Sequence, residues 1–162
     1  MGYSVETVVD FFWRQARLQG ESLDVLKIHR LVYIATCWAW AVFNRPLLDE
    51  SLGATKYGPV VPSLLVQLKS LGAGFLLEPI GSTEALRRSL DEETERFLNC
   101  IWVKYGGYSG IQLTRLIHED RESPWRQARL RSHVTPLPVI QPRSMRDRYL
   151  KLVAVSQAAH RA

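Results

Sequence analysis

Residues 31–43 read LVYIATCWAWAVF, and nearly every position in this stretch is apolar. A helix that is apolar on all sides is typically a central helix around which other elements pack. The stretch is shorter than the roughly 20 residues that a membrane-spanning helix needs. The run Asn44-Arg45-Pro46 ends the helix, and residues 22–23 mark its start. We therefore predict a buried core helix over residues 23–43.

The sequence on either side of this stretch predicts further helices. Apolar residues recur there at helical spacing. Helix-start signals are Ser4, the pair Ser89 and Glu92, and the pair Ser109 and Gln112. The predicted helices span residues 4–19, 61–71, 89–104, 109–118 and 143–158, with Pro124-Trp125 in a turn or short helix. A small β element or hairpin is predicted near residues 51–58 and 75–81.

The predicted fold is mainly α, a compact single-domain helical bundle around the buried helix 23–43. The chain has 162 residues, of which 46% are hydrophobic and 23% charged. Both values are in the range of one globular domain. We expect one domain over residues 1–162, with a core over 4–130, an extended proline-containing connection over 132–142 and a basic C-terminal helix over 143–158.

Charge is distributed unevenly along the chain. The net charge is +5, yet residues 1–120 carry −2 and the segment from Arg121 onward carries +7. The first 120 residues therefore do not have the charge of a nucleic-acid-binding body. The basic segment is able to contact an acidic partner or RNA, but a solvated helix face explains it as well. We favour the solvated face and expect no nucleic acid as the main partner.

The two cysteines, Cys37 and Cys100, each lie in an apolar helical pattern rather than at ligand spacing. No Cys-x-x-Cys or Cys/His cluster is present, so we expect no metal site and no cofactor. Unpaired cysteines fit a reducing compartment. The N-terminus carries no basic-then-apolar signal pattern. Cytoplasmic localisation without a membrane anchor is the resulting expectation.

A basic strip opens the predicted central helix. Lys27 and Arg30 are three residues apart, which makes them neighbours on a helix surface, and Tyr33 follows them. The strip is able to pair with acidic groups of a partner. Alternatively, the long side chains extend over the core while their charged ends reach water. From the residues alone, we favour the second interpretation.

The most distinctive string is Lys56-Tyr57-Gly58-Pro59, followed by Val60-Val61-Pro62. Pro59 fixes its own backbone and restricts the preceding residue, while Gly58 permits a sharp reversal. Tyr57 is thereby placed on a rigid turn before the next helix. Such an aromatic side chain is suited to anchor a partner at low entropic cost. Steering the chain into that helix is an equally good explanation.

The sequence offers little support for catalysis. His118, followed by Glu119 and Asp120, ends a predicted helix. An acid–base pair is one interpretation, but a histidine in a last helical turn more often interacts with the helix dipole. The glycine-rich run at 106–110 lacks the strand before it and the lysine after it that a phosphate-binding loop requires. We expect that the protein is not an enzyme.

Several of these strings occur together in one known family. They are Leu26-Lys27-Ile28-His29-Arg30-Leu31-Val32-Tyr33, Trp38, Pro46-Leu47, Lys56-Tyr57-Gly58-Pro59-Val60-Val61-Pro62, Tyr105-Gly106, Ser109, Leu113, His118 and Pro124-Trp125. In this order they resemble the Panacea antitoxin domain, whose members include SocA-like proteolytic adaptors and phage-associated relatives. The resemblance covers roughly residues 4–155. The family usually has Leu-Gln-Lys-Leu-Leu-Tyr in the central helix, where this chain has Ile28, His29, Arg30 and Val32.

The resemblance implies an antitoxin that neutralises a protein toxin by direct binding. A first alternative is a SocA-like adaptor that delivers the toxin to a AAA+ protease. A second is a nucleic-acid-binding or regulatory factor that uses the basic C-terminal segment. A homodimer also stays open. The candidate partner-binding residues are Lys27, Arg30, Tyr33, Lys56, Tyr57, Gly58, Pro59 and Trp125, with His29 and His118 as secondary candidates.

Overall fold

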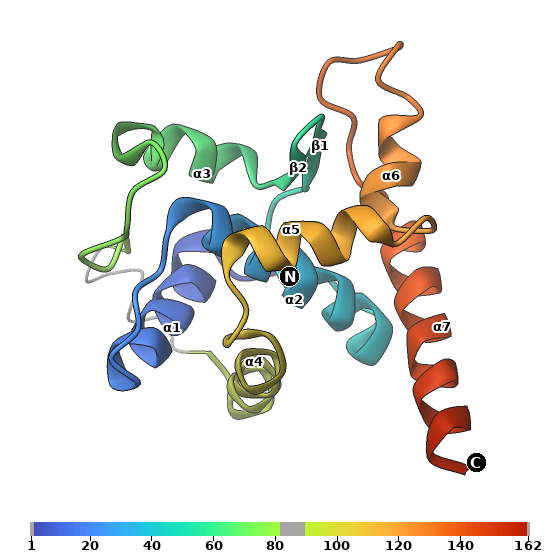
Figure 1. Cartoon of the computed structure of the whole chain (residues 1–162), viewed down its shortest axis with the longest axis horizontal. Coiled ribbons are helices and arrows are strands. Elements are labelled where there is room, and N and C mark those ends of the chain that lie inside the picture. The colour runs from blue at the N-terminus through green and yellow to red at the C-terminus, as the bar shows by residue number, and fades with distance from the viewer. Residues whose placement is uncertain (1, 82–89, 162) are drawn as a thin grey trace.

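Helix α2 (Val25–Phe43) lies at the centre of the fold (Figure 1). The computed structural model describes residues 2–81 and 90–161. The Asp24 carboxylate accepts the Lys27 N–H at 2.8 Å and so caps the start of α2. Asn44 ends the helix in the left-handed conformation, with φ of 52°. The predicted central helix is therefore confirmed.

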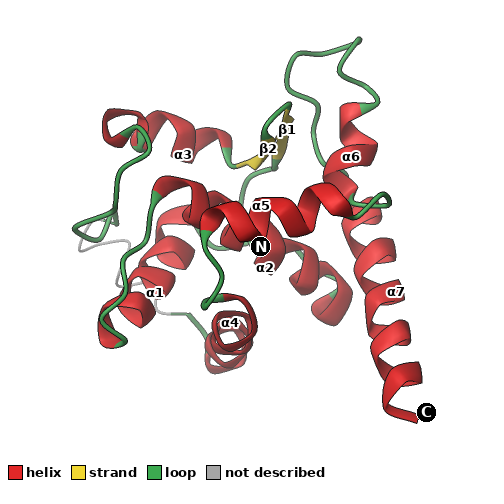
Figure 2. Cartoon of the chain, in the orientation of Figure 1, coloured by secondary structure: helices red, strands yellow, loops and turns green. Residues whose placement is uncertain are grey.

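Helices from both halves of the chain surround α2. They are α1 (Val5–Leu18), α3 (Pro62–Gln67), the 3₁₀ helix η1 (Lys69–Leu71), α4 (Glu92–Tyr105), α5 (Gly110–Glu119), α6 (Pro124–Arg129) and α7 (Pro142–Arg161). Helices α1, α4, α5 and α7 contact α2 directly, and Figure 2 shows how much of the chain is helical. One hydrophobic core includes residues from Val5 in α1 to Tyr149 in α7. The mainly α prediction is confirmed.

By length and composition alone, α2 is the one helix among the described residues that is able to cross a membrane. Its mean hydropathy is 1.2 over the tested window, and 67% of that window is buried inside the fold. The core helix of a water-soluble protein passes the same test. The burial of α2 by four other helices explains its apolar character without a bilayer.

Two of the three predicted helix-start signals are present in the structure. The Ser4 hydroxyl accepts the Thr7 N–H at the start of α1. Ser109 and Gln112 form a reciprocal capping box at the start of α5. The Ser89 part of the third signal lies outside the described residues. Among the described residues, Asp91 caps α4, because its carboxylate accepts the Thr94 N–H at 2.8 Å.

A small antiparallel hairpin contacts α2 and α5. Strands β1 (Gly53–Thr55) and β2 (Gly58–Val60) pair with Thr55 opposite Gly58. This confirms the predicted hairpin at the first of its two positions. Residues 75–81 contribute one isolated bridge, between Asp24 and Phe75, rather than a strand.

Residues 75–81 are instead attached to α1 by a buried acid. The Asp10 carboxylate is 1% exposed and accepts the N–H groups of Ile80 at 2.8 Å and Gly81 at 2.9 Å. Burial raises the pKa of Asp10, and these two hydrogen bonds oppose the rise. Side-chain bonds thus replace the strand pairing that the sequence suggested.

The proline-containing connection runs beside the hairpin. The Ala54 N–H donates to Pro138 O at 2.8 Å, and the Ile140 N–H donates to Leu52 O at 2.9 Å. This segment therefore extends the edge of β1 before α7 begins. Met145 and Tyr149 of α7 are buried against the fold, whereas Figure 1 shows the C-terminal end of α7 standing away from the other helices.

Candidate functional site

The loop between β1 and β2 presents Tyr57 to solvent on a closed backbone turn. The Thr55 hydroxyl donates to Gly58 O at 2.8 Å and accepts the Tyr57 N–H at 3.2 Å. The Tyr57 side chain is 69% exposed. The Lys56 ammonium lies 5.0 Å from the centroid of the Tyr57 ring, within range of a cation–π contact. We call residues 55–59 the Tyr57 turn.

The Arg30 side chain supports the Tyr57 turn from beneath. Its guanidinium donates to Pro59 O at 2.6 Å, to Tyr57 O at 3.0 Å and to the Thr114 hydroxyl at 3.0 Å. Arg30 is 3% exposed, and burial lowers its pKa to about 10, so it stays charged at neutral pH. Its planar fork suits two carbonyls at a fixed separation. Arg30 thus ties the turn to α2 and α5 at once.

Gly58 allows the close contact between the turn and Arg30. Its φ is +146°, a conformation that residues with a side chain rarely adopt. A Cβ at this position would lie 2.5 Å from Arg30 Cζ. The glycine is therefore required by both the backbone conformation and the packing of the guanidinium.

Three side chains from α5 and α6 also contact carbonyls of the hairpin and its turn. Trp125 Nε1 donates to Thr55 O at 2.7 Å, and Arg129 donates to Ala54 O at 3.1 Å. His118 Nε2 lies 3.1 Å from Tyr57 O, a contact that requires the hydrogen on that nitrogen. The rings of His118 and Trp125 stack at 4.3 Å with an interplanar angle of 3°. The turn is therefore fixed by three helices.

The structure brings most of the predicted site residues together. Six of them form one cluster, namely Arg30, Tyr57, Gly58, Pro59, His118 and Trp125. Lys56 lies on the same turn, and His29 lies next to Arg30 in α2. Of these, Lys56 and Tyr57 are exposed, His118 is partly buried and the rest are buried.

Lys27 and Tyr33 point into the fold instead. Lys27 is 6% exposed, its ammonium donates to Gly106 O at 2.5 Å, and it lies 5.2 Å from the Trp102 ring centroid. Tyr33 is 1% exposed, and its hydroxyl accepts the Trp125 N–H at 3.4 Å. The prediction that Lys27 and Arg30 form an exposed basic strip is therefore wrong. The alternative prediction, that their charged ends reach water, is wrong as well. Carbonyls at the end of α4 and in the Tyr57 turn accept these cations inside the protein.

Sequence reasoning missed Thr114 and Arg129. Arg129 lies four residues after Trp125, so the two side chains share one face of α6. That spacing was an available signal, because both side chains bind hairpin carbonyls. Thr114 gave no signal, since its contact with Arg30 joins residues 84 positions apart.

His29 is a buried neutral imidazole beside the cluster. Its Nδ1 accepts the Val61 N–H at 3.3 Å, which leaves the hydrogen on Nε2. Nε2 is buried and has no hydrogen-bond partner in the part of the chain that the structure describes. Burial, and then the Arg30 charge, lower the pKa of His29 from 6.5 to about 4.

This pKa predicts a loss of stability in mild acid. The unfolded chain binds the His29 proton more tightly than the folded protein, so the contribution is complete above pH 6.5 and declines as the pH falls towards 4. Between pH 7 and pH 5 we expect a loss of about 2 kcal/mol. Urea unfolding across this range measures it. A His29→Gln variant keeps an acceptor for Val61 and is expected to remove this part of the slope. Equal slopes in both proteins would exclude His29 as the cause.

A groove opens beside the Tyr57 turn. It has a volume of about 730 Å³ and is lined by the start of α2, the hairpin, α3, the turn after η1, Arg129 and Pro136. His29, Arg30 and Tyr57 all line it. The exposed tyrosine and the buried polar cluster thus share one concave surface.

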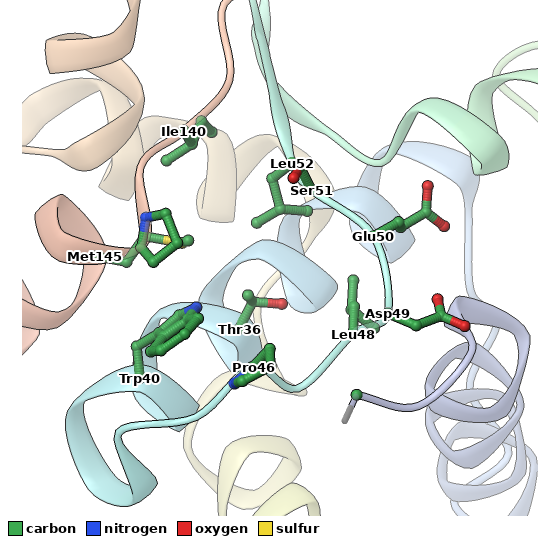
Figure 3. A pocket seen from close by; sticks show the side chains of 12 residues that line it. Thr36, Trp40, Pro46, Leu48, Asp49, Glu50, Ser51, Leu52, Ile140 and Met145 are labelled. Carbon is green, nitrogen blue, oxygen red and sulfur yellow. The ribbon is translucent and has the colours of Figure 1, made fainter.

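A second pocket, of about 380 Å³, lies between α2, residues 46–52 and the start of α7. In Figure 3, the carboxyl groups of Asp49 and Glu50 point away from Trp40 and Met145. Two polar side chains of this pocket have partners in the protein, since Thr36 donates to Val32 O and Glu50 accepts from Ser63. Its chemistry is less specific than that of the groove beside Tyr57.

The family model described as antitoxin SocA-like, Panacea domain, matches residues 28–126, which is more than half of the chain. The protein belongs to this Panacea-domain family. The matched region begins in α2 and ends in α6, so it includes the Tyr57 turn together with Arg30, Thr114, His118 and Trp125. No curated protein and no solved structure matched the chain.

Helices α1 and α7 lie outside the matched part of this Panacea-domain protein. In α7, several cations are paired with carboxylates. Arg148 contacts Asp120 at 2.9 Å and Glu122 at 2.8 Å, and Lys151 lies 3.5 Å from Glu122. The basic segment predicted from the sequence is therefore partly neutralised in the folded protein.

Proposed function

We propose that the protein is an antitoxin that neutralises a protein toxin in the cytoplasm by binding it at the surface around the Tyr57 turn. It acts in this proposal by contact and not by catalysis. The observation that carries the proposal is the 69% exposed Tyr57 side chain on a turn whose carbonyls are bound by Arg30 and His118. Membership of the antitoxin-like family supports a toxin as the partner.

Physical reasons favour this turn as an anchor. A tyrosine brings a large amphipathic surface to an interface and loses little side-chain entropy. Four side chains already fix the backbone around Tyr57, so binding orders few additional groups. The neighbouring Lys56 adds an exposed charge that is suited to an acidic partner.

Replacing Tyr57 by alanine is expected to weaken binding of the toxin encoded in the adjacent reading frame by at least about thirtyfold. Stability is expected to change by less than about 0.5 kcal/mol, because the side chain is exposed. Calorimetric titration measures the loss of affinity for the toxin, and rescue of growth measures the loss of neutralisation. Tyr108→Ala is the matched control, since Tyr108 is 41% exposed on the turn before α5. Undiminished neutralisation by a folded Tyr57→Ala protein would exclude this surface.

Delivery of the toxin to a AAA+ protease is the second candidate function. Residues 154–161 at the end of α7 are exposed, and this end stands away from the fold (Figure 1). It is a free helix surface for a protease contact. The half-life of the toxin in cells with and without the protease separates delivery from direct masking. An unchanged half-life would leave masking as the mechanism.

A further inference from the structure

Among the described residues, the charges that line the groove beside the Tyr57 turn are all positive. They are Arg30, Lys56 and Arg129, and no Asp or Glu of residues 2–81 and 90–161 lines the groove. Lys56 is exposed at the rim, Arg129 is partly buried and Arg30 is buried at the base. A concave surface with one sign of charge selects a ligand of the opposite sign.

Arg30 has donors to spare. A guanidinium carries five N–H groups, and three of its nitrogens each donate once, to Thr114, Pro59 and Tyr57. All of these acceptors are uncharged, and no carboxylate lies within 4.0 Å of Arg30 among residues 2–81 and 90–161. The other buried cation of α2, Lys27, does have Glu21 at 4.0 Å. A buried charge without a counter-charge is costly, so Arg30 gains from an anion supplied by a ligand.

His29 provides a second, independent observation. It is 97% buried, lines the same groove, and its Nε2–H has no acceptor within the described residues. Buried polar groups in proteins nearly always have a partner. Both buried polar side chains of the groove are thus donors without a full set of acceptors. A carboxylate accepts several such bonds at once.

Most of the other residues that line the groove are apolar. Val60 and Leu65 line it, and Leu65 remains 41% exposed. A nucleic-acid backbone binds rows of exposed cations, but Lys56 is the only exposed cation among the described residues that line the groove. The combination of buried donors and an apolar wall fits an acidic side chain flanked by apolar residues.

We infer that this groove receives a protein segment in which an aspartate or glutamate is flanked by apolar side chains, with the carboxylate directed to Arg30 and His29. This inference rests on the proposed function, because the segment belongs to the toxin. Tyr57 at the rim then contacts the same segment from the solvent side. The acidic residue supplies the counter-charge that Arg30 lacks among the described residues.

Leu65→Asp tests the inference, because it places a negative charge inside the groove. Leu65→Asp is expected to raise the Kd for the adjacent-gene toxin by about thirtyfold or more, since like charges oppose each other at an interface. Val66→Asp is the matched control: Val66 is the next residue of α3, is 77% exposed and does not line the groove. It is expected to change the Kd by less than about threefold.

A second pair of variants keeps the test independent of any folding defect in α3. Lys56→Glu reverses the exposed charge at the rim, and Lys104→Glu reverses an exposed lysine that also lies over a tyrosine ring. Only Lys56→Glu is expected to weaken toxin binding. A toxin with one groove-facing acid changed to lysine is expected to bind the Lys56→Glu protein better than the wild type.

The outcomes separate this inference from the proposed function. If the toxin binds and Tyr57→Ala weakens it, but Leu65→Asp and Lys56→Glu bind as tightly as wild type, the groove is excluded and the antitoxin function stands. If the wild type binds no toxin, the function itself fails. Tight, salt-dependent binding of a 20-nucleotide RNA that Leu65→Asp abolishes would assign the groove to nucleic acid. A dimer that Leu65→Asp dissociates would assign it to a second copy of this chain. Either result would overturn the inference.

Discussion

Replacing Arg30 by alanine is expected to lower the free energy of unfolding by about 4 kcal/mol. The change removes three hydrogen bonds at the base of the Tyr57 turn and leaves the carbonyl of Pro59 buried without a donor. Each unsatisfied buried acceptor costs about 1–3 kcal/mol, and the removed side chain leaves a cavity. Relief of the buried charge offsets part of this loss. Urea unfolding measures the change as a shift of the midpoint at constant slope.

Two further variants serve as comparisons for Arg30→Ala. Arg115 is exposed on α5, so Arg115→Ala is expected to stay within about 0.5 kcal/mol of the wild type. Arg30→Lys keeps the charge but not the planar fork. We expect it to lose about 2 kcal/mol, because one ammonium cannot match two carbonyls with the same geometry. If Arg30→Ala and Arg115→Ala were equally stable, Arg30 would have no role in holding the turn.

The elements of the fold were largely predictable because local sequence determines them. The apolar run at 31–43 is suited to a buried helix in any compact arrangement. The helix ends at Asn44, which adopts the left-handed backbone conformation. The capping box of Ser109 and Gln112 involves only residues three apart. The turn at 56–59 likewise depends on its own glycine and proline. Such signals do not depend on what the rest of the chain does.

The placement of the site residues was predictable only in part. Helical spacing correctly placed Lys27 and Arg30 as neighbours on one face of α2. It did not indicate what covers that surface. Arg30 is buried because the hairpin and Thr114 of α5 cover it, and Lys27 is buried because the end of α4 covers it. The residues in these contacts are separated by between 27 and 84 positions in the sequence, and a single sequence contains no signal for such contacts.

The lack of a signal for tertiary contacts also explains why the strand predicted at 75–81 is not observed. Its apolar residues are compatible with a strand, but a strand needs a partner edge of the sheet. Here, Leu76 donates to Leu23 O at 2.8 Å, and Asp10 accepts the N–H groups of Ile80 and Gly81. The backbone is satisfied by a helix start and a carboxylate instead of by a ladder. Only the tertiary arrangement decides between these partners.

Replacing Gly58 by alanine is expected to cost about 3 kcal/mol and to weaken toxin binding together with stability. The residue has a φ of +146°, which costs about 1–3 kcal/mol for a residue with a side chain. The added methyl group would lie 2.5 Å from Arg30 Cζ, so the guanidinium must move away from its carbonyl acceptors. Urea unfolding and toxin titration measure both effects on the same variant.

Two other glycines separate the backbone strain from the contact with Arg30. Gly72 has a φ of +56° with a ψ of −118° and open space around it, so Gly72→Ala is expected to cost about 2 kcal/mol from backbone strain alone. Gly107 has neither a positive φ nor a neighbour within 4 Å, so Gly107→Ala is expected to be neutral or slightly stabilising. If Gly58→Ala cost no more than Gly72→Ala, contact with Arg30 would contribute nothing. If the three differ in the expected order, the Tyr57 turn needs its glycine both for its backbone conformation and because Arg30 lies directly beneath it.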